Sequence, residues 1–479
     1  MSNKYIYLLI FLLISVGIYS QDKNTIDIKL ETAGTLTDGD FAPFWITNNN
    51  FGIGSEKTKN VYLRSSILYG NKLFDNKLAL SIEADMIVSH NLQSDFYFHQ
   101  LYADLKYRSL GLTIGAKENN SLFKNKQLSS GGLALSKNYR PIPQIEIGIP
   151  EFTNVPFTKG YLQVMGGLSF GKFLDDDYKK HHAKDGLYAL NVLYHKKYAF
   201  LKFQNKPSWN VILGAEFNTQ WGGELYREGE MWAKAPKDFK NFMKILVPGG
   251  GDSKATESDQ ANTLGNVNGS WHFIFNYNAA DYSLKAYHEH IFEDKSGMMF
   301  QNIPDGLYGI EVNLKKRQLI SSVLFEFLYT RDQSGPGTYP DGRTRFRGND
   351  NYYNHGEYGS MTYYGYVLGN PLLISPLYNK GESIRIWNNK ITAYHLGISG
   401  FIANQFQHRL LFTYSRSYGS PLKIQPTYKQ FSALAEVTYS PSKLIGWNFT
   451  GALAFDNAKE MIGDNLGFRL KAVKNFSIR

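Results

Sequence analysis

The sequence predicts an all-β fold, a transmembrane antiparallel β-barrel with long external loops and a short helix in one loop. Three observations support this prediction. Apolar residues recur with a period of two, aromatic residues make up 15% of the chain with 33 Tyr and 32 Phe, and short connections alternate with long ones. Transmembrane barrels need aromatic side chains as lipid-facing bulk and as girdles at both membrane interfaces. A soluble all-β protein rich in Tyr and Phe is the alternative for the aromatic content alone.

Residues 1–20 have the pattern of a secretory signal peptide. Lys4 precedes an apolar stretch from Tyr5 to Ile14, and Ser20 precedes a polar sequence. A basic start, a short apolar middle and a small residue at the exit are typical of such signals. The stretch is too short to span a membrane comfortably as a helix. We expect cleavage near Ser20 and one barrel domain over 21–479, with an uncleaved anchor as the alternative.

The strands are predicted from strict alternation. In residues 78–86, apolar Leu78, Leu80 and Ile82 interleave with polar Ser81 and Glu83. We count roughly 16–18 such segments, each near the ~10 residues that a tilted strand needs to cross a bilayer. Alternation alone does not separate a barrel from a soluble sandwich, but a sandwich with so many strands in one chain would be unusual. Closure into a barrel also removes the strand edges that lipid does not tolerate.

The connections differ in length. Tight turns are predicted at 71–76 and 109–111, and long connections at about 118–140, 220–269 and 330–390. Outer-membrane barrels have short periplasmic turns and long external loops. Within one long connection, residues 236–246 place Phe239, Phe242, Met243 and Leu246 at helical spacing, ended by Pro248 and Gly249–Gly251. This segment predicts a short amphipathic helix.

Composition excludes several classes of chemistry. The absence of cysteine removes disulfides, thiolate nucleophiles and zinc–thiolate sites. The net charge of +10 is scattered, which argues against a nucleic-acid-binding arm. That charge suits anionic lipid or an acidic glycan, or it is ordinary solvated loop charge. No nucleophile elbow, phosphate loop or dinucleotide fingerprint is present. A Ser-His-acid arrangement stays open because its members need only be close in space.

Two pairs of histidines are candidates for metal binding. His288-Glu289-His290 would place both histidines on one face of a strand, but it lacks the helical spacing and the third ligand of a metal site. His181 and His182 are expected in a loop. We therefore predict no metal, no cofactor and no catalytic residue.

Polar clusters with aromatic neighbours suit the recognition of sugars. Amides, carboxylates and arginine bind glycan hydroxyls, and aromatic faces stack on the apolar side of the ring. Three stretches have this composition: Trp45 with Asn48–Asn50, Gln220-Trp221, and residues 343–354 with Arg345, Arg347, Asn351, Tyr352 and Tyr353. The alternative is that they are ordinary loop and interface residues.

A set of motifs in a fixed order resembles the Wzi-type capsule-assembly family, especially its Bacteroidetes branch. The motifs are Phe41-Ala42-Pro43-Phe44-Trp45-Ile46-Thr47-Asn48-Asn49, Ser129-Ser130-Gly131-Gly132-Leu133-Ala134-Leu135-Ser136, Arg140-Pro141-Ile142-Pro143-Gln144 with Ile149-Pro150, Gln220-Trp221-Gly222-Gly223, Phe292-Glu293-Asp294-Lys295-Ser296-Gly297, Asp305-Gly306-Leu307-Tyr308-Gly309 and Asp350-Asn351-Tyr352-Tyr353-Asn354. The resemblance covers nearly the whole mature chain.

The resemblance implies an outer-membrane barrel of about 18 strands in a Gram-negative bacterium. It implies a surface lectin that holds exported capsular polysaccharide or exopolysaccharide on the cell and is not an enzyme. The implied partners are the polysaccharide, outer-membrane lipid and lipopolysaccharide, and the barrel-assembly machinery. Gln220, Trp221, Glu293, Asp294, Ser296 and Asp305 match recurrent family positions, and the same motifs would also serve to hold the barrel together. The chain departs from the usual aromatic terminus, because Phe476 lies inside the end.

Two other functions remain as alternatives. A passive channel for small solutes would be lined by luminal charges such as Glu83, Asp85, Lys106 and Arg108. An outer-membrane hydrolase or acyltransferase would need a nucleophile and base near an external rim, and the sequence offers no candidate pair.

Overall fold

The computed structural model of the protein describes residues 24–74, 77–183, 186–246, 265–333, 350–381 and 383–478, with 335, 337–338, 344–345 and 348. The predicted signal peptide, the turn residues Asp75 and Asn76, and the expected helix stop at Pro248–Gly251 lie outside the described residues.

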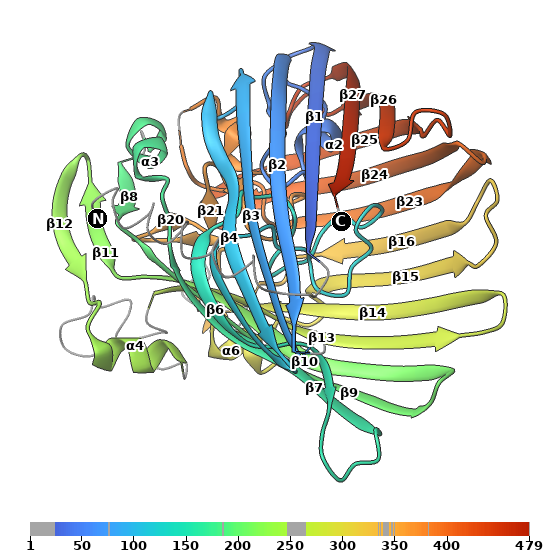
Figure 1. Cartoon of the computed structure of the whole chain (residues 1–479). Helices are drawn as coiled ribbons and strands as arrows, with labels where there is room; N and C mark the ends of the chain where they lie inside the picture. The colour runs from blue at the N-terminus through green and yellow to red at the C-terminus, as the bar shows by residue number, and fades with distance from the viewer. Residues whose placement is uncertain are drawn as a thin grey trace, which may run out of the picture.

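Eighteen strands of the described chain form one closed antiparallel sheet (Figure 1). The first, β1 (Thr25–Asp38), pairs with β2 on one side and with the last strand, β27 (Asn465–Ile478), on the other. This closure confirms the predicted fold class. The remaining wall strands are β2 (Lys59–Leu73), β3 (Leu78–His90), β4 (Phe96–Tyr107), β5 (Leu110–Ala116), β6 (Pro143–Asn154), β7 (Leu162–Lys172), β9 (Leu193–Lys206), β10 (Trp209–Trp221), β13 (Asn266–Asn278), β14 (Tyr282–Phe292), β15 (Gly306–Leu314), β16 (Ser322–Tyr329), β23 (Ile391–Ala403), β24 (Phe406–Ser420), β25 (Lys423–Tyr439) and β26 (Trp447–Asn457).

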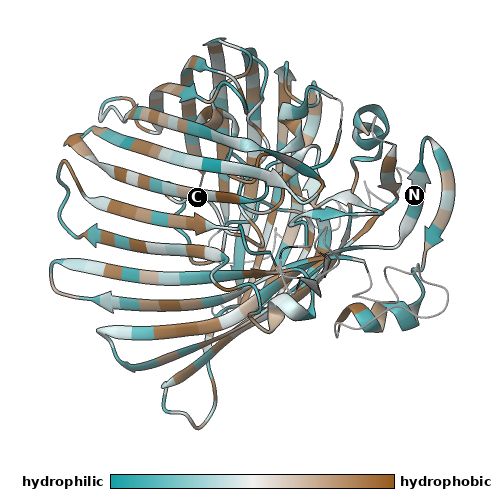
Figure 2. Cartoon of the chain, turned by 180° about the vertical axis from the view of Figure 1, so that it is seen from behind, coloured by the Kyte–Doolittle hydropathy of each residue, from teal (hydrophilic) through white to brown (hydrophobic). Residues whose placement is uncertain are grey.

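Alternation along the strands gives the wall two chemically different faces. On β27, Leu466, Phe468 and Leu470 point outward and are 45–58% exposed, while Arg469 and Lys471 point into the lumen. Figure 2 shows the same alternation of apolar and polar residues along the other wall strands. An exterior of exposed Leu, Ile and Phe is what a bilayer requires of a transmembrane barrel.

The two ends of the barrel differ, as the sequence predicts. At the short-turn end, where the described chain begins at β1 and ends at β27, β4 and β5 are joined by only two residues. At the opposite end, which we call the loop end, long connections cover 39–58, 117–142, 173–192, 222–265 and 330–390. The structured parts of several of these connections gather on the left of Figure 1.

The long connections carry most of the short elements. They are α2 (Phe44–Thr47), α3 (Asp176–His182), β8 (Leu187–Leu190), β11 (Gly223–Arg227), β12 (Glu230–Ala235), α4 (Phe239–Leu246), α6 (Lys295–Met298), β17 (Gly337–Thr338), β18 (Thr344–Arg345), β19 (Asn354–His355), β20 (Gly359–Ser360), β21 (Thr362–Tyr363), β22 (Tyr366–Val367) and η2 (Pro376–Asn379). The predicted helix at 236–246 is confirmed as α4. Among the described residues, every helix is too short or too polar to cross a membrane.

The expectation of a loop at His181 and His182 is wrong, because both residues end helix α3. The ring of His182 stacks on that of Tyr178 with 4.1 Å between centroids. Each histidine also places Nδ1 within 2.8 Å of the carbonyl oxygen four residues earlier. These local contacts stabilise a turn of helix that no apolar periodicity announces.

The core of the molecule lies in the lumen. Three inward-folded segments, residues 41–55, 121–142 and 351–378, are mostly buried, and we call them together the luminal plug. Phe44, Leu133 and Tyr353 are fully buried members of its apolar centre. Burial of large apolar side chains inside the barrel contributes about 1.5–3 kcal/mol each, so the plug is a folded core and not a loose set of loops.

We expect Leu470→Arg to destabilise the barrel by about 2–4 kcal/mol, because it places a charge on the lipid face near the middle of β27. Leu466→Arg is the matched control. It makes the same change on the same face at the end of the strand, where the cost falls to about 0–1 kcal/mol. Denaturant unfolding in lipid bilayers measures both, and equal losses would contradict the assigned position of the strand in the membrane.

Candidate functional site

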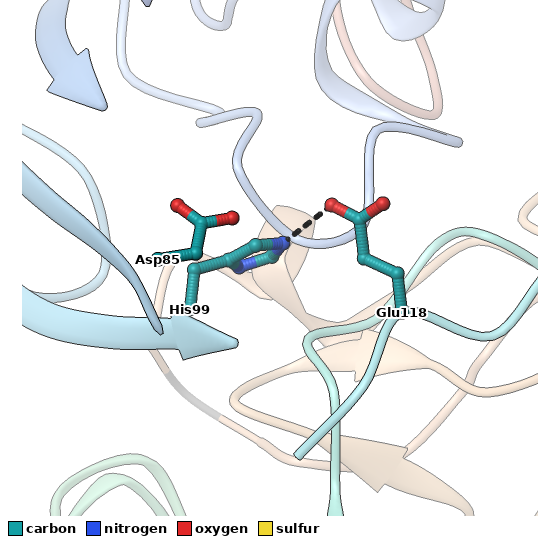
Figure 3. Close-up of side chains that lie close together, drawn as sticks. All are labelled: Asp85, His99 and Glu118. Atoms are coloured by element: carbon teal, nitrogen blue, oxygen red, sulfur yellow. Dashed lines mark hydrogen bonds and ion pairs between the residues drawn. The ribbon is translucent and has the colours of Figure 1, made fainter. Parts of the chain in front are cut away.

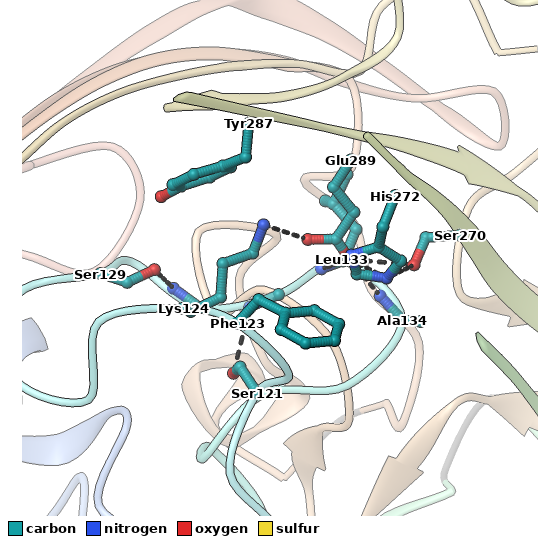
Figure 4. A network of polar contacts seen from close by, with 12 residues as sticks. Ser121, Phe123, Lys124, Ser129, Leu133, Ala134, Ser270, His272, Tyr287 and Glu289 are labelled. Carbon is teal, nitrogen blue, oxygen red and sulfur yellow. Dashed lines mark hydrogen bonds and ion pairs between the residues drawn. The ribbon is translucent and has the colours of Figure 1, made fainter. Parts of the chain in front are cut away.

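Carboxylates on the wall hold the plug in place. Glu289 of β14 is fully buried and accepts hydrogen bonds from the backbone N–H of Leu133 at 2.6 Å and of Ala134 at 3.2 Å (Figure 4). Its second oxygen lies 2.8 Å from Nζ of Lys124. Backbone N–H groups buried away from water need such acceptors, so Glu289 fixes the plug to the wall.

A second wall carboxylate repeats this arrangement two strands away. Glu326 of β16 accepts hydrogen bonds from the hydroxyl of Ser129 at 2.6 Å and the N–H of Ser130 at 2.7 Å. The hydroxyl of Tyr287 donates to the same side chain. Four strands further around the wall, Asp456 of β26 accepts from the N–H of Phe44 at 3.0 Å. The plug is therefore anchored at several positions around the wall.

Two predicted site residues hold the third plug segment in the same way. Glu293 accepts a hydrogen bond from the N–H of Tyr353 at 2.5 Å, and Asp305 accepts from the hydroxyl of Tyr352 at 2.7 Å. Asp305 also accepts from the N–H of Gln333 at 2.6 Å. Burial raises the pKa of Asp305 to about 7 and raises that of Glu293 well above its usual value.

Most of the other predicted site residues are also buried inside the structure. The Trp45 indole donates to Oγ1 of Thr413 at 3.1 Å, and Gln220 donates to the Ser360 carbonyl at 3.2 Å. Trp221 is 5% exposed and packs near Phe242 of α4. Their side chains are occupied by contacts within the protein.

The remaining predicted site residues have local roles or lie beyond the described side chains. Asp294 caps α6 by accepting from the N–H of Gly297 at 3.0 Å and the hydroxyl of Ser296 at 2.7 Å. Asn351 accepts from Asn354 and Asn389. Arg345 belongs to β18 but its side chain lies outside the described part of the structure, as does the whole of Arg347.

Two buried clusters combine histidine with carboxylates, but each already contains a basic side chain. Asp85, His99 and Glu118 face one another in Figure 3. Arg64 donates to Asp85 at 2.9 Å and to Glu118 at 2.7 Å. Burial alone would raise the pKa of Glu118, but His99 and Arg64 lower it to about 2. The guanidinium thus occupies the place where a cation would bind.

The second cluster joins Glu216, His272 and Glu289, with Lys124 as its cation. It also contains a serine, since Ser270 Oγ lies 2.9 Å from Nε2 of His272. The same Nε2 faces Glu216 at 3.1 Å, and Nδ1 of the ring has no partner among the described residues. A serine triad needs the acid on the nitrogen opposite the nucleophile, so this geometry is that of a structural network.

The predicted metal candidate lies on the outer wall. His288 and His290 share the outward face of β14, as strand alternation predicts, with 6.0 Å between ring centroids. His288 stacks on Tyr308 with 4.2 Å between centroids, and His290 packs at a tilt against Phe300 with 4.7 Å between centroids. Glu289 points the other way, into the lumen. The two rings therefore join aromatic neighbours near the loop end.

A cavity of about 610 Å³ opens at the loop end, and we call it the external cleft. Four connections meet there, and its lining combines aromatic rings, amides and charges of both signs. The lining residues are Asp40, Phe41, Glu56, Lys57, Thr58, Lys59, Asn91, Gln93, Tyr178, His182, Pro376, Leu377, Lys380 and Gly381.

Charged and aromatic side chains lie close together in the external cleft. Phe41 packs edge-on against Tyr378 with 5.2 Å between centroids. Lys380 lies 3.4 Å from Asp40, and both side chains are more than 60% exposed. Of the lining residues, only Phe41, within a motif, and His182, as an expected loop residue, were singled out from the sequence. The others were missed because they come from separate connections without a shared pattern.

Comparisons with known proteins agree with this architecture. A family model described as capsule assembly protein Wzi matches residues 45–372. The Escherichia coli outer-membrane protein Wzi, described as a carbohydrate-binding β-barrel involved in group 1 capsule assembly, has a TM-score of 0.59 at 13% identity, covering 94% of this chain and 85% of that one. Pseudomonas aeruginosa OprD has a TM-score of 0.48 at 10% identity, covering 96% and 98% of the two chains. Acinetobacter baumannii OccAB4 has a TM-score of 0.47 at 10% identity, covering 96% and 99%. No curated protein sequence matches the chain.

The anchoring role of Glu289 predicts a large loss of stability on truncation. Glu289→Ala leaves Lys124 and two backbone N–H groups buried without their acceptor, and we expect a loss of about 3–5 kcal/mol. Glu151→Ala is the control, because Glu151 forms an exposed ion pair with Lys106 and such pairs contribute about 0–1 kcal/mol. The stability of both variants can be compared by the temperature at which the folded band disappears on electrophoresis. If Glu289→Ala unfolds at the same temperature as the control, Glu289 does not anchor the plug.

The raised pKa of Asp305 predicts that the third plug segment loosens as pH rises. The unfolded carboxyl titrates near pH 4, so the stabilising contribution of Asp305 is complete below that pH. It declines as pH increases and is lost above about pH 7. We expect faster hydrogen exchange at Tyr352 and Tyr353 at pH 8 than at pH 5, after correction for intrinsic rates. Asp305→Asn should abolish this difference in exchange rate between pH 5 and pH 8. An unchanged difference in the variant would contradict the prediction and point to another titrating group, such as Glu293.

Proposed function

Because the chain belongs to the Wzi family of capsule assembly proteins, we propose that it retains exported capsular or extracellular polysaccharide on the outer surface of the cell. It is an outer-membrane β-barrel of a Gram-negative bacterium. In this proposal it acts as a lectin and catalyses no reaction. The relative from Escherichia coli is described as carbohydrate-binding, which supports a polysaccharide as the partner.

The external cleft is the observation that carries the proposal. It lies at the loop end, which in outer-membrane barrels faces the exterior, so exported polysaccharide would reach it directly. The rings of Phe41 and Tyr178 line the cleft, together with the amide groups of Asn91 and Gln93, which suit sugar hydroxyls.

The buried predicted residues would support this cleft from below. Nδ2 of Asn48 donates to the hydroxyl of Tyr378 at 2.9 Å, and Tyr378 packs against Phe41. Trp45 belongs to the same short helix, α2, whose first N–H is held by Asp456. We propose that Asn48, Trp45 and the other buried plug residues position the cleft and influence glycan binding only through the residues that line it.

The rest of the wall fits the other proposed partners. The outward Leu and Phe side chains would contact outer-membrane lipid and lipopolysaccharide, and the barrel-assembly machinery would insert the chain after removal of residues 1–20. The channel alternative gains no support, because the plug packs as a buried apolar core inside the described barrel. The hydrolase alternative gains none either, because the described Ser270–His272 pair is buried.

The test is to delete the gene in its host and measure cell-bound and released polysaccharide. We expect polysaccharide to move from cells to medium with total synthesis unchanged, and the wild-type gene to restore retention. Tyr178→Ala should retain less, since loss of one aromatic face is expected to weaken binding about 5–10-fold.

Tyr161→Ala provides the matched control for this experiment. Tyr161 is 52% exposed, but it lies in the connection between β6 and β7 at the short-turn end. It should retain polysaccharide as the wild type does. Deletion without any change in cell-bound polysaccharide would refute the proposed function. Equal loss of retention in the Tyr178 and Tyr161 variants would show that the external cleft is not the site of polysaccharide binding.

A further inference from the structure

A second polar cavity, of about 360 Å³, lies inside the barrel on the other side of the plug. Its walls are the luminal faces of β1, β2 and β24–β27, and its ceiling is formed by the plug. We call it the luminal cavity. Lys29, Arg409 and Glu436 of its lining lie three or four residues from the short-turn ends of their strands. Tyr62 and Arg469, by contrast, lie three or four residues from the loop ends of β2 and β27. The cavity therefore extends from the plug toward the short-turn, periplasmic end of the barrel.

The lining of the luminal cavity is strongly basic. It contains seven Lys and Arg side chains against three carboxylates, Glu31, Glu118 and Glu436. Each carboxylate is already paired, with Lys29 at 2.5 Å, Arg64 at 2.7 Å and Arg409 at 3.1 Å respectively. Four cations of the lining are thus left over, and Asp85, which lies just outside the lining and shares Arg64 with Glu118, offsets one of these charges.

The four remaining cations are Lys126, Lys137, Arg469 and Lys471, and none has an ion-pair partner among the described residues. Arg469 donates to the Ile46 carbonyl at 3.1 Å, but its buried Nε has no acceptor in the described part of the chain. Lys137 donates to the Lys126 carbonyl. Burial and the nearby charge of Arg409 lower the pKa of Lys137 to about 8. A concentration of positive charge in a partly enclosed space attracts anions strongly.

The uncharged lining favours a sugar over a simple ion. The amides of Asn50, Gln127 and Gln407 and the ring of Phe51 surround the basic groups. Inorganic anions need only charge and hydrogen-bond donors, whereas amides and an aromatic ring match hydroxyls and a sugar face. The cavity also remains in contact with water, because the Lys29 and Arg409 side chains are 32% and 22% exposed.

We propose that the luminal cavity binds a carboxylate-bearing sugar chain that enters from the periplasmic side. The choice of a sugar chain rests on the proposed function, while the preference for negative charge rests on the cavity alone. The protein would then have two carbohydrate sites, one on each side of the plug. Arg469 and Lys471 would bind carboxylates, and Lys126 would contribute from the plug.

The test uses full-length protein in detergent micelles and titration calorimetry with a short oligogalacturonate. A maltooligosaccharide of equal length is the neutral ligand, and inorganic phosphate is the simple anion. We expect the acidic oligosaccharide to bind at least tenfold more tightly than either, with affinity that falls as salt increases. Equal binding of the neutral sugar, or phosphate that matches the acidic sugar, would overturn the proposal.

Variants place the binding in the luminal cavity. Lys471→Gln combined with Lys126→Gln should reduce affinity at least tenfold, and Lys443→Gln, the same change in the exposed turn between β25 and β26, should leave it unchanged. Heat-modifiable mobility on electrophoresis confirms folding. If the double variant does not fold, Lys126→Gln alone can be used, because Lys126 is exposed and its substitution should not disturb folding. It should still weaken binding at least threefold, because Lys126 lines the cavity. Unchanged affinity in either folded variant would overturn the proposal.

Tyr178→Ala separates this inference from the proposed function. Tyr178 lines the external cleft and not the luminal cavity, so the folded variant should bind oligogalacturonate as the wild type does. Loss of binding in that variant would assign the acidic ligand to the external cleft and overturn the luminal site. Luminal binding that persists while gene deletion leaves polysaccharide on the cells would instead refute the retention function.

Discussion

The structure depends on pairing between carboxylates of the barrel wall and backbone N–H groups of the inward-folded segments. A connection that enters the lumen loses water and must find acceptors for its N–H groups. Glu289, Glu326 and Asp456 supply them from the wall, and Glu293 and Asp305 supply them from the connection between β14 and β15. With these contacts made, three irregular segments become a folded core, and the two polar cavities take their shapes from its opposite faces.

The fold was largely predictable because a membrane imposes a simple rule. Each spanning segment must show an apolar face to lipid at every second residue, and that pattern is visible at 78–86 and along the last strand. The short helix at 239–246 was predictable because an amphipathic helix shows its period in the sequence. Helix α3 was not, since it is stabilised by the Tyr178–His182 stack and local hydrogen bonds, which leave no periodic signal.

The site was predictable only in part. Residues with the composition of sugar binding are buried in the described structure, Trp45 and Tyr352 within the plug and Gln220 on β10 against it. Buried anchors and sugar contacts use the same amides, carboxylates and aromatic rings, so composition does not tell them apart. The lining of the external cleft and of the luminal cavity comes from residues scattered over the chain, and only the closed barrel brings them together.

The pairing of the first connection with the last strands has a consequence for biogenesis. The N–H groups of Phe41 and Phe44 bind Asn465 and Asp456, more than 400 residues later in the chain. Contacts so distant in sequence carry a large loop-closure entropy and form late. The plug segment made first therefore stays without its acceptors until the final two strands arrive. The wall therefore closes and the plug seals the lumen at the same step, and a barrel without its last two strands would let solutes pass.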